Sequence, residues 1–172
     1  KITCITGASS GIGRACAVEF AKQGSHLLLM ARRKDRIDDL ARQLKQDHRV
    51  KTHAVQLDVT DNAKVVKAFS SLPDEWKAID ILVNNAGHAS FKPFTELSVE
   101  EWRKTIDVNL TGVFLCTKAV LPSMIKRRSG RIINISSVAG LKPLMDQSAY
   151  CASKHGLNGF TKVLAMELRQ YG

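Results

Sequence analysis

The fold is decided by Ile2-Thr3-Cys4-Ile5-Thr6-Gly7-Ala8-Ser9-Ser10-Gly11-Ile12-Gly13, at the start of the chain. Its first part is apolar and β-branched, as in a strand, and the residues that follow Gly13 have the apolar spacing of a helix. A strand, a glycine-rich turn and a helix in this order seat a pyrophosphate on the helix N-terminus, where unpaired N–H groups and the helix dipole favour anions. The spacing is G-x-x-x-G-x-G rather than the commoner G-x-G-x-x-G. The stretch therefore predicts a nucleotide-binding unit, while a purely structural turn would also fit this motif taken alone.

A second motif, Tyr150-Cys151-Ala152-Ser153-Lys154, lies near the other end of the chain, thirteen residues after Ser137. Positions i and i+4 share one face of a helix, so Tyr150 and Lys154 can act on one substrate. A tyrosine has an ordinary pKa of about 10, and a neighbouring ammonium stabilises its phenolate. An ordinary helix with a surface tyrosine and lysine is the alternative, because Y-x-x-x-K also occurs by chance. The glycine turn at the other end of the chain favours the catalytic interpretation.

Apolar runs of strand length alternate with helical stretches along the whole sequence. We expect a last helix at 149–169 and strands at 2–6, 26–31, 51–57, 80–83 and 131–136. Such alternation predicts an α/β protein with a doubly wound parallel sheet and right-handed crossovers. The sequence has no repeat, low-complexity tract or linker, so we expect a single domain over residues 1–172.

Composition and hydropathy indicate a soluble globular protein, with 44% hydrophobic and 24% charged residues. The longest aliphatic run, Leu27-Leu28-Leu29-Met30-Ala31, is too short to span a bilayer, and Lys1 opens directly into a strand without a signal-peptide pattern. We therefore expect no membrane contact for this segment and a cytoplasmic location, while a targeting or anchoring segment upstream could have been removed.

The net charge of +10 raises the possibility of a nucleic-acid-binding protein. The basic residues are scattered, however, and the two small clusters, Arg32-Arg33-Lys34 and Lys126-Arg127-Arg128, have no interleaved aromatic platform. We interpret the second cluster as a solvated helix end and expect no nucleic-acid partner.

The cysteines and histidines do not indicate a metal site. The chain has four cysteines, Cys4, Cys16, Cys116 and Cys151, which form no C-x-x-C pair, and its histidines have no ligand spacing. We therefore expect free thiols in a reducing compartment and no metal site.

Taken together, the motifs resemble those of the single-domain short-chain dehydrogenases/reductases. The resemblance covers essentially the whole chain and rests on Thr6 to Gly13, Asn84-Asn85-Ala86-Gly87, Asn109, Ser137, and the Tyr150 and Lys154 pair. It implies a Rossmann fold with strand order 3-2-1-4-5, a nicotinamide cofactor, a small carbonyl or alcohol substrate, and a homodimer or homotetramer. Members of this family continue past the last helix with strands six and seven. We therefore expect that the chain, which stops at Gly172, is truncated at its C-terminus.

The resemblance also assigns roles. It makes Tyr150 the general acid in reduction and the base in oxidation, and Lys154 the cation that lowers its pKa and bonds the nicotinamide ribose. Ser137 is expected to donate to the carbonyl oxygen, and Asn109 to hold a water that links the lysine to solvent. The cofactor is expected to contact Gly7, Ser9, Ser10, Gly11, Ile12, Gly13, Arg32, Arg33, Asp58, Val59, Asn85, Ala86, Gly87, Tyr150 and Lys154.

The end of the second expected strand bears on the choice of cofactor. In dinucleotide-binding folds an acidic residue there bonds the ribose hydroxyls, whereas a basic one accommodates a 2′-phosphate. Here the strand ends Met30-Ala31-Arg32-Arg33, which predicts NADP(H) in preference to NAD(H), with Arg32 as first choice for the phosphate and Arg33 as alternate. Against this, Ser10 occupies a position where NADP-dependent relatives often have arginine or lysine. The two arginines could also merely solvate a helix start.

Asp58 follows the third expected strand and has two open interpretations. By resemblance it bonds the adenine amino group, but it could equally cap the helix that begins near Thr60 and Asp61.

The substrate is indicated only weakly, because by resemblance the specificity loops lie mostly in the C-terminal part that we expect to be missing, and because the segments present point to different relatives. Residues 72–83 resemble dehydrogenases of serine and other 3-hydroxy acids, whereas 121–128 and 148–155 look like broad carbonyl, retinoid or steroid reductases. We rank a 3-hydroxy acid or small carbonyl first. A non-catalytic redox sensor that binds a dinucleotide is the rival from another class, and the complete set of Asn109, Ser137, Tyr150 and Lys154 argues against it.

Overall fold

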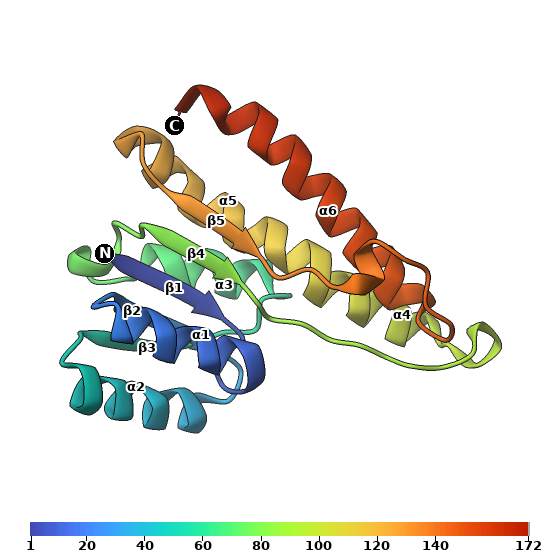
Figure 1. Ribbon diagram of the computed structural model, residues 1–172, viewed down its shortest axis with the longest axis horizontal. Coiled ribbons are helices and arrows are strands. Elements are labelled where there is room, and N and C mark those ends of the chain that lie inside the picture. The colour runs from blue at the N-terminus through green and yellow to red at the C-terminus, as the bar shows by residue number, and fades with distance from the viewer. Residues whose placement is uncertain (172) are drawn as a thin grey trace.

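The central strand, β1 (Ile2–Thr6), pairs in parallel with β2 (His26–Ala31) on one side and β4 (Ile81–Asn84) on the other. The computed structural model describes residues 1–171, and its five strands form one parallel sheet in the order β3-β2-β1-β4-β5 (Figure 1). The outer strands are β3 (Thr52–Gln56) and β5 (Arg131–Asn134). This order confirms the predicted doubly wound fold.

Helices connect each strand to the next and cover both faces of the sheet. The α-helices of the described residues are α1 (Gly11–Lys22), α2 (Lys34–His48), α3 (Asn62–Ser70), α4 (Val99–Ile106), α5 (Gly112–Arg127) and α6 (Ser148–Leu168). Short 3₁₀ turns are η1 (Asp74–Trp76), η2 (Phe94–Glu96), η4 (Val138–Gly140) and η5 (Arg169–Tyr171), and a π turn, η3 (Asp107–Thr111), joins α4 to α5.

Two apolar layers bury the central strand on both sides, which explains why it reads as a continuous apolar run rather than an alternating one. Ile5 belongs to the layer formed with α1 and α2, together with Leu27 and Leu29 of β2. Cys4 points to the other face and packs with Leu28 and with residues of α3 and α5. Neighbouring residues of a strand point to opposite faces, so the core lies on both sides of β1.

The long helical segment Val99–Arg127 is the one described helix long and apolar enough to cross a membrane by length and composition. Cys116, Val120 and Met124 of this segment are buried in the core against the sheet. Asn109, which the sequence places within a long helix, lies in the π turn between α4 and α5. Isolated π turns inside helices often mark functional sites.

Asp80 ties the start of the sheet to the end of α5. Its carboxylate accepts hydrogen bonds from the backbone N–H of Ile2 at 2.8 Å and from the guanidinium of Arg127 at 3.0 Å. Arg127 also donates to the carbonyl oxygen of Ile79. The interpretation of Lys126-Arg127-Arg128 as only a solvated helix end is therefore wrong for Arg127, because β4 places a carboxylate within its reach.

The predicted strands 2–6 and 26–31 coincide with β1 and β2, and the other predicted boundaries lie within two residues of the observed ones. The expected strand 51–57 is one residue longer at each end than β3, and the expected strand 131–136 runs two residues beyond β5. Hydrogen-bond patterns at element ends fade gradually, so differences of this size are usual. The last helix begins one residue earlier and ends one residue earlier than predicted.

Two glycines allow a matched test of this fold. A Cβ on Gly13 would come within 2.5 Å of the Gly7 carbonyl oxygen and closer still to Asn85 Nδ2. We expect Gly13→Ala to lower the free energy of unfolding by about 1–3 kcal/mol or more, as overpacking does. At Gly159 in α6 a Cβ meets nothing within 4 Å, so Gly159→Ala should raise stability by about 0.5–1 kcal/mol. Thermal denaturation measures both, and equal melting temperatures for the two variants would contradict the described packing of the glycine turn.

Candidate active site

The first turns of α6 present Tyr150 and Lys154 on one face. Lys154 is 5% exposed, and its Nζ donates a hydrogen bond to the carbonyl oxygen of Ile135 at 2.7 Å. The same Nζ lies 5.6 Å from the centroid of the Tyr150 ring. Ile135 directly follows β5, so this hydrogen bond fixes α6 against the carboxyl end of the sheet. The helical spacing thus brings the Lys154 ammonium close to the ring of Tyr150.

Burial lowers the pKa of Lys154, because the charged form loses part of its hydration. A cation held away from water also acts more strongly on neighbouring groups, since less solvent screens it. The poorly screened charge of Lys154 therefore lies beside the ring of Tyr150.

Ser137 lies at the start of η4, two residues after Ile135. Its Oγ accepts a hydrogen bond from the backbone N–H of Ala139 at 3.1 Å. The hydroxyl proton thus remains available for donation to a bound oxygen. Gly140 ends this turn close to α6, because a Cβ there would lie 2.9 Å from the carbonyl oxygen of Lys154. The turn therefore holds Ser137 beside the helix that carries Tyr150.

Asn109 is completely buried and joins three segments. Its Oδ1 accepts from His88 N–H and its Nδ2 donates to His88 C=O, both at 2.8 Å. Nδ2 also donates to Ser153 Oγ at 3.0 Å, and Ser153 Oγ donates to the carbonyl oxygen of Tyr150 at 2.7 Å. Asn109 thus connects the loop after β4 to the helix of Tyr150 and Lys154. The water predicted between Asn109 and the lysine stays a prediction.

Sequence reasoning missed Ser153 and His88. A serine inside the Y-x-x-x-K motif, one residue before Lys154, is the only sequence signal for Ser153. His88 contributes backbone atoms to Asn109, and nothing about its residue type indicates that role.

The glycine turn and the Asn84–Gly87 segment form one wall. Thr6 Oγ1 accepts from the backbone N–H groups of Asn85 and Ala86 at 3.0 and 3.1 Å. Asn85 Nδ2 in turn donates to the carbonyl oxygens of Thr6 and Gly7. Gly7 has φ of 67°, and a Cβ there would lie 2.8 Å from Ala86 Cα, so only glycine suits this position.

A pocket of about 300 Å³ opens beside this wall, at the carboxyl ends of the strands. Gly11, Gly13, Tyr150 and Lys154 are not among the residues that line it. The other predicted cofactor residues do line it, namely Gly7, Ser9, Ser10, Ile12, Arg32, Arg33, Asp58, Val59, Asn85, Ala86 and Gly87. His88 and Lys104, which the sequence did not indicate, line it as well.

The N-terminus of α1 faces this pocket and suits a phosphate. Ser10 is the N-cap residue, but its side chain makes no capping hydrogen bond to the helix. The first-turn N–H groups therefore lack a side-chain acceptor and are suited to bind an anion. The Oγ atoms of Ser9 and Ser10 instead accept from Arg33 Nη2 at 2.9 and 2.8 Å. Arg33 thus places a positive charge on the glycine turn. Ser10, at the position where NADP-dependent relatives often have arginine or lysine, is itself uncharged. These residues fit a nucleotide that carries phosphates.

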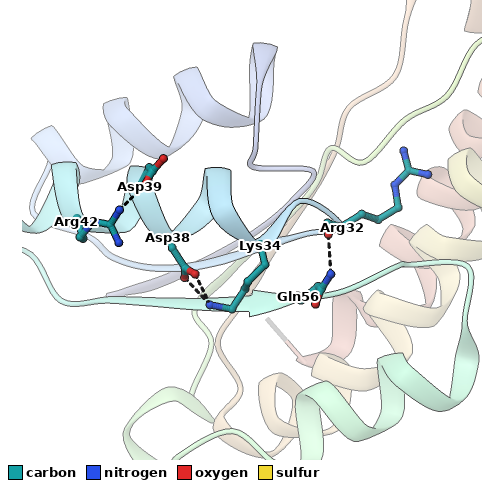
Figure 2. Close-up of polar contacts among 6 residues, drawn as sticks. All are labelled: Arg32, Lys34, Asp38, Asp39, Arg42 and Gln56. Carbon is teal, nitrogen blue, oxygen red and sulfur yellow. Dashed lines mark hydrogen bonds and ion pairs between the residues drawn. The ribbon is translucent and has the colours of Figure 1, made fainter.

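Arg32 is held differently from its basic neighbours. Figure 2 shows its side chain extending away from α2, while its backbone oxygen accepts from Gln56 Nε2 at 2.9 Å. Lys34 pairs with Asp38 on the same helix. Among residues 1–171 the guanidinium of Arg32 has no hydrogen bond or ion pair, so it is available to a ligand of the pocket.

The pocket is electrically positive. The pKa of His88 is lowered first by its burial and then by the nearby charges of Lys104 and Arg32. A neutral His88 leaves the positive charge of the pocket to the arginines and Lys104, which matches a ligand with several phosphate charges.

Asp58 does not cap a helix. Its Oδ1 accepts from the N–H and the hydroxyl of Thr60 at 3.1 and 2.8 Å. The cap of α3 is Asp61, whose carboxylate accepts from Lys64 N–H. The helix-cap alternative for Asp58 is therefore wrong, and the residue lines the pocket within a local turn.

Within residues 1–171, no group of three or more histidine, cysteine, aspartate or glutamate side chains could hold a metal ion. The four cysteines are free; Cys4 and Cys116 are buried, and Cys16 and Cys151 are half-buried.

Two serines of α6 test the Asn109 linkage. Ser153→Ala removes the hydroxyl between Asn109 and Tyr150 and leaves buried polar atoms without a partner, so we expect a loss of about 1–3 kcal/mol in the free energy of unfolding. Ser148 is the matched control, because its buried hydroxyl has no hydrogen-bond partner within residues 1–171. Ser148→Ala should be neutral or slightly stabilising. Urea denaturation compares the two, and a tolerated Ser153→Ala would show that the linkage contributes little.

Comparison with known proteins supplies independent evidence. The chain is 41% identical over 168 residues to the 3-oxoacyl-(acyl-carrier-protein) reductase FabG of Aquifex aeolicus, a match that covers 98% of the chain and 68% of the relative. It is 39% identical to the NADP-dependent 3-hydroxy acid dehydrogenase YdfG of Shigella flexneri, covering 97% of the chain and 66% of the relative.

The fold agrees with solved structures. A metagenomic short-chain oxidoreductase crystallised in complex with NADP superposes with a TM-score of 0.94 at 35% sequence identity, covering 99% of the chain and 77% of that structure. The sequence model described as short chain dehydrogenase matches residues 1–172. The chain belongs to the short-chain dehydrogenase/reductase family of oxidoreductases.

Proposed function

We propose that the protein reversibly reduces a carbonyl compound to an alcohol with NADP(H). The observation that carries this proposal is the buried ammonium of Lys154, bonded to Ile135 C=O and placed 5.6 Å from the centre of the Tyr150 ring. A tyrosine beside a desolvated cation is suited to proton exchange. The pocket at the α1 N-terminus supports the same function, because it fits a phosphorylated nucleotide.

In the direction of reduction, Tyr150 gives its phenolic proton to the carbonyl oxygen. Lys154 stabilises the phenolate that results, and Ser137 donates its hydroxyl proton in a hydrogen bond to the same oxygen while negative charge develops there. A nicotinamide cofactor, when bound in the pocket at the α1 N-terminus, would supply the hydride for the carbonyl carbon. Oxidation of an alcohol runs the same steps backwards, with Tyr150 as the base. Asn109 positions the helix of Tyr150 and Lys154 through Ser153.

The proposed cofactor preference for NADP(H) over NAD(H) rests on two arginines with different tasks. Arg32 has an unengaged guanidinium that can grip a 2′-phosphate, and Arg33 adds charge on the glycine turn through Ser9 and Ser10. No carboxylate replaces them at the end of β2. The NADP-dependent relative supports this preference.

We further propose a homodimer or homotetramer in the cytoplasm. Trp102 of α4 and Phe114 of α5 are 38% and 44% exposed. Large apolar side chains left in solvent on the outer side of the long helical segment favour contact with another subunit. The free cysteines favour a reducing compartment.

Replacing the proposed proton donor tests the chemistry. Tyr150→Phe should lower turnover at least about a hundredfold, the usual contribution of a general acid, while cofactor affinity stays nearly unchanged. Lys154→Ala should weaken both turnover and cofactor binding. Nicotinamide absorbance with a panel of carbonyl compounds measures turnover. Tyr171→Phe is the matched control, because Tyr171 lies in η5, beyond the end of α6 that is far from Tyr150. Turnover by Tyr150→Phe within threefold of that of the unmodified protein would contradict the assignment of Tyr150 as the proton donor. If the unmodified protein binds the cofactor but turns over none of the compounds, the redox-sensor alternative is favoured.

Replacing the two arginines tests the cofactor preference. Removing a hydrogen bond to a charged group costs about 1.5–3 kcal/mol, so Arg32→Ala with Arg33→Ala should reduce the preference for NADPH over NADH at least about tenfold. Arg42→Ala is the matched control, because Arg42 pairs with Asp39 on the exposed face of α2. Equal use of NADPH and NADH by the unmodified protein would contradict the proposal.

A further inference from the structure

Exposed apolar side chains gather on the two loops that follow β4 and β5. In the described part of the chain, fourteen large hydrophobic residues are exposed, and six of them belong to these loops. We call these six the apolar rim: Phe91, Phe94, Val138, Leu141, Leu144 and Met145. Phe91 is 65% exposed and Met145 is 89% exposed, which is costly in water unless something covers them.

The apolar rim adjoins the proposed reacting groups. The ring of Phe91 meets the ring of Tyr150 edge-on, with 6.3 Å between centroids and an angle of 67°. Val138 directly follows Ser137, the proposed donor to the carbonyl oxygen. Farther along the same loop, the carbonyl oxygen of Leu144 lies 4.0 Å from the Sγ of Cys151, one residue after Tyr150. A molecule whose carbonyl reaches Tyr150 would therefore lay its remaining atoms on the rim.

One hydrogen bond joins the two loops, and further contacts tie the loop after β4 to α4. Lys92 N–H donates to Asp146 C=O at 2.9 Å, which joins the loop after β4 to the loop after β5, and Figure 1 shows both at the same end of the molecule, near α4 and the start of α6. Lys92 Nζ forms an ion pair with Glu101 at 2.7 Å, and Glu101 also bonds the backbone N–H of Ser98. Lys92 and Ser98 hold the pKa of Glu101 down to about 2, so this anchor stays charged near neutral pH. The exposure of the rim is thus a feature of loops fixed at several points.

The charges of these loops do not favour an anionic substrate. Residues 88–98 and 135–147 contain no arginine, the residue that binds carboxylates through two parallel hydrogen bonds. Lys92 is neutralised by Glu101, and Lys154 already donates to Ile135 C=O. Lys142 is the remaining lysine of the two loops, and with Glu96 and Asp146 counted as well these residues carry no net charge. A carboxylate beside the rim would lose hydration with little to replace it.

We infer that the substrate is an uncharged ketone or aldehyde, or the matching alcohol, whose apolar body packs on the rim. This inference rests on the proposed function for the reaction itself. In reduction, a hydride with its two electrons forms the new C–H bond, the C=O π bond breaks, and Tyr150 supplies the proton of the new O–H group, while the nicotinamide is oxidised. The 3-hydroxy acid ranked first from the sequence is the competing substrate class.

The test compares an ester with its carboxylate, ethyl 3-oxohexanoate and 3-oxohexanoate, which differ in charge and by the ethyl group of the ester. We expect kcat/KM with NADPH to be at least about tenfold higher for the ester, because apolar pockets discriminate by factors of this order. Leu141→Ser together with Met145→Ser should lower kcat/KM for the ester about tenfold and leave that for the acid nearly unchanged. Val66→Ser is the matched control, since Val66 is an exposed apolar residue of α3. Lys142→Met should not affect the ester.

Binding measurements separate this inference from the reaction class. Calorimetric titration of both compounds into the protein with NADP⁺ should show tighter binding of the ester, weakened in the rim variant. The inference would be overturned if the acid binds more tightly than the ester, or if Lys142→Met abolishes binding of the acid. It would also be overturned if the ester binds the Leu141→Ser, Met145→Ser variant as tightly as the unmodified protein. Absence of turnover with both compounds and with the carbonyl panel would contradict the proposed function, and the titration would still decide what the rim accepts.

Discussion

A buried positive charge is the constraint around which the candidate site is built. Lys154 is a buried residue, and a charge without a partner in such a place would be destabilising. Its hydrogen bond to Ile135 C=O compensates part of that cost and requires α6 to lie against the end of β5. Once α6 is in that position, Tyr150 and Ser153 occupy fixed places, and Ser153 can reach Asn109 in the π turn. The position of one lysine thus orders three separate segments of the chain.

The nucleotide pocket depends on the topology of the sheet. β1 and β4 are neighbours although seventy-four residues separate the end of one from the start of the other, and their carboxyl ends meet where helices leave in different directions. Thr6 and Asn85 exchange hydrogen bonds across this point, which joins the glycine turn to the segment after β4. Ligands of open α/β sheets bind at such points because no side of the crevice is closed by a connecting helix.

Much of this could be predicted from the sequence, because the deciding features are local. Apolar runs marked the strands, the glycine spacing marked the turn, and the i and i+4 relation of Tyr150 and Lys154 brought their side chains together. Contacts between distant segments could not be read in the same way. Arg33 meets Ser9 across twenty-four positions, and the Arg127 and Asp80 pair depends on where α5 ends relative to β4. The π turn around Asn109 has no sequence signature, and the choice of Asp61 over Asp58 as helix cap was decided by where α3 begins.

The groups proposed for catalysis are held mainly by main-chain atoms. Lys154 bonds a carbonyl oxygen, Asn109 bonds both backbone groups of His88, and Ser153 bonds the carbonyl oxygen of Tyr150. Backbone partners persist when neighbouring side chains are exchanged. Rim side chains other than Phe91, whose ring contacts Tyr150, can therefore mutate while these hydrogen bonds stay in place, so that specificity and chemistry are largely free to evolve separately. Such independence gives a physical reason why one scaffold occurs among relatives named for substrates as different as a carrier-bound oxoacyl chain and a free hydroxy acid.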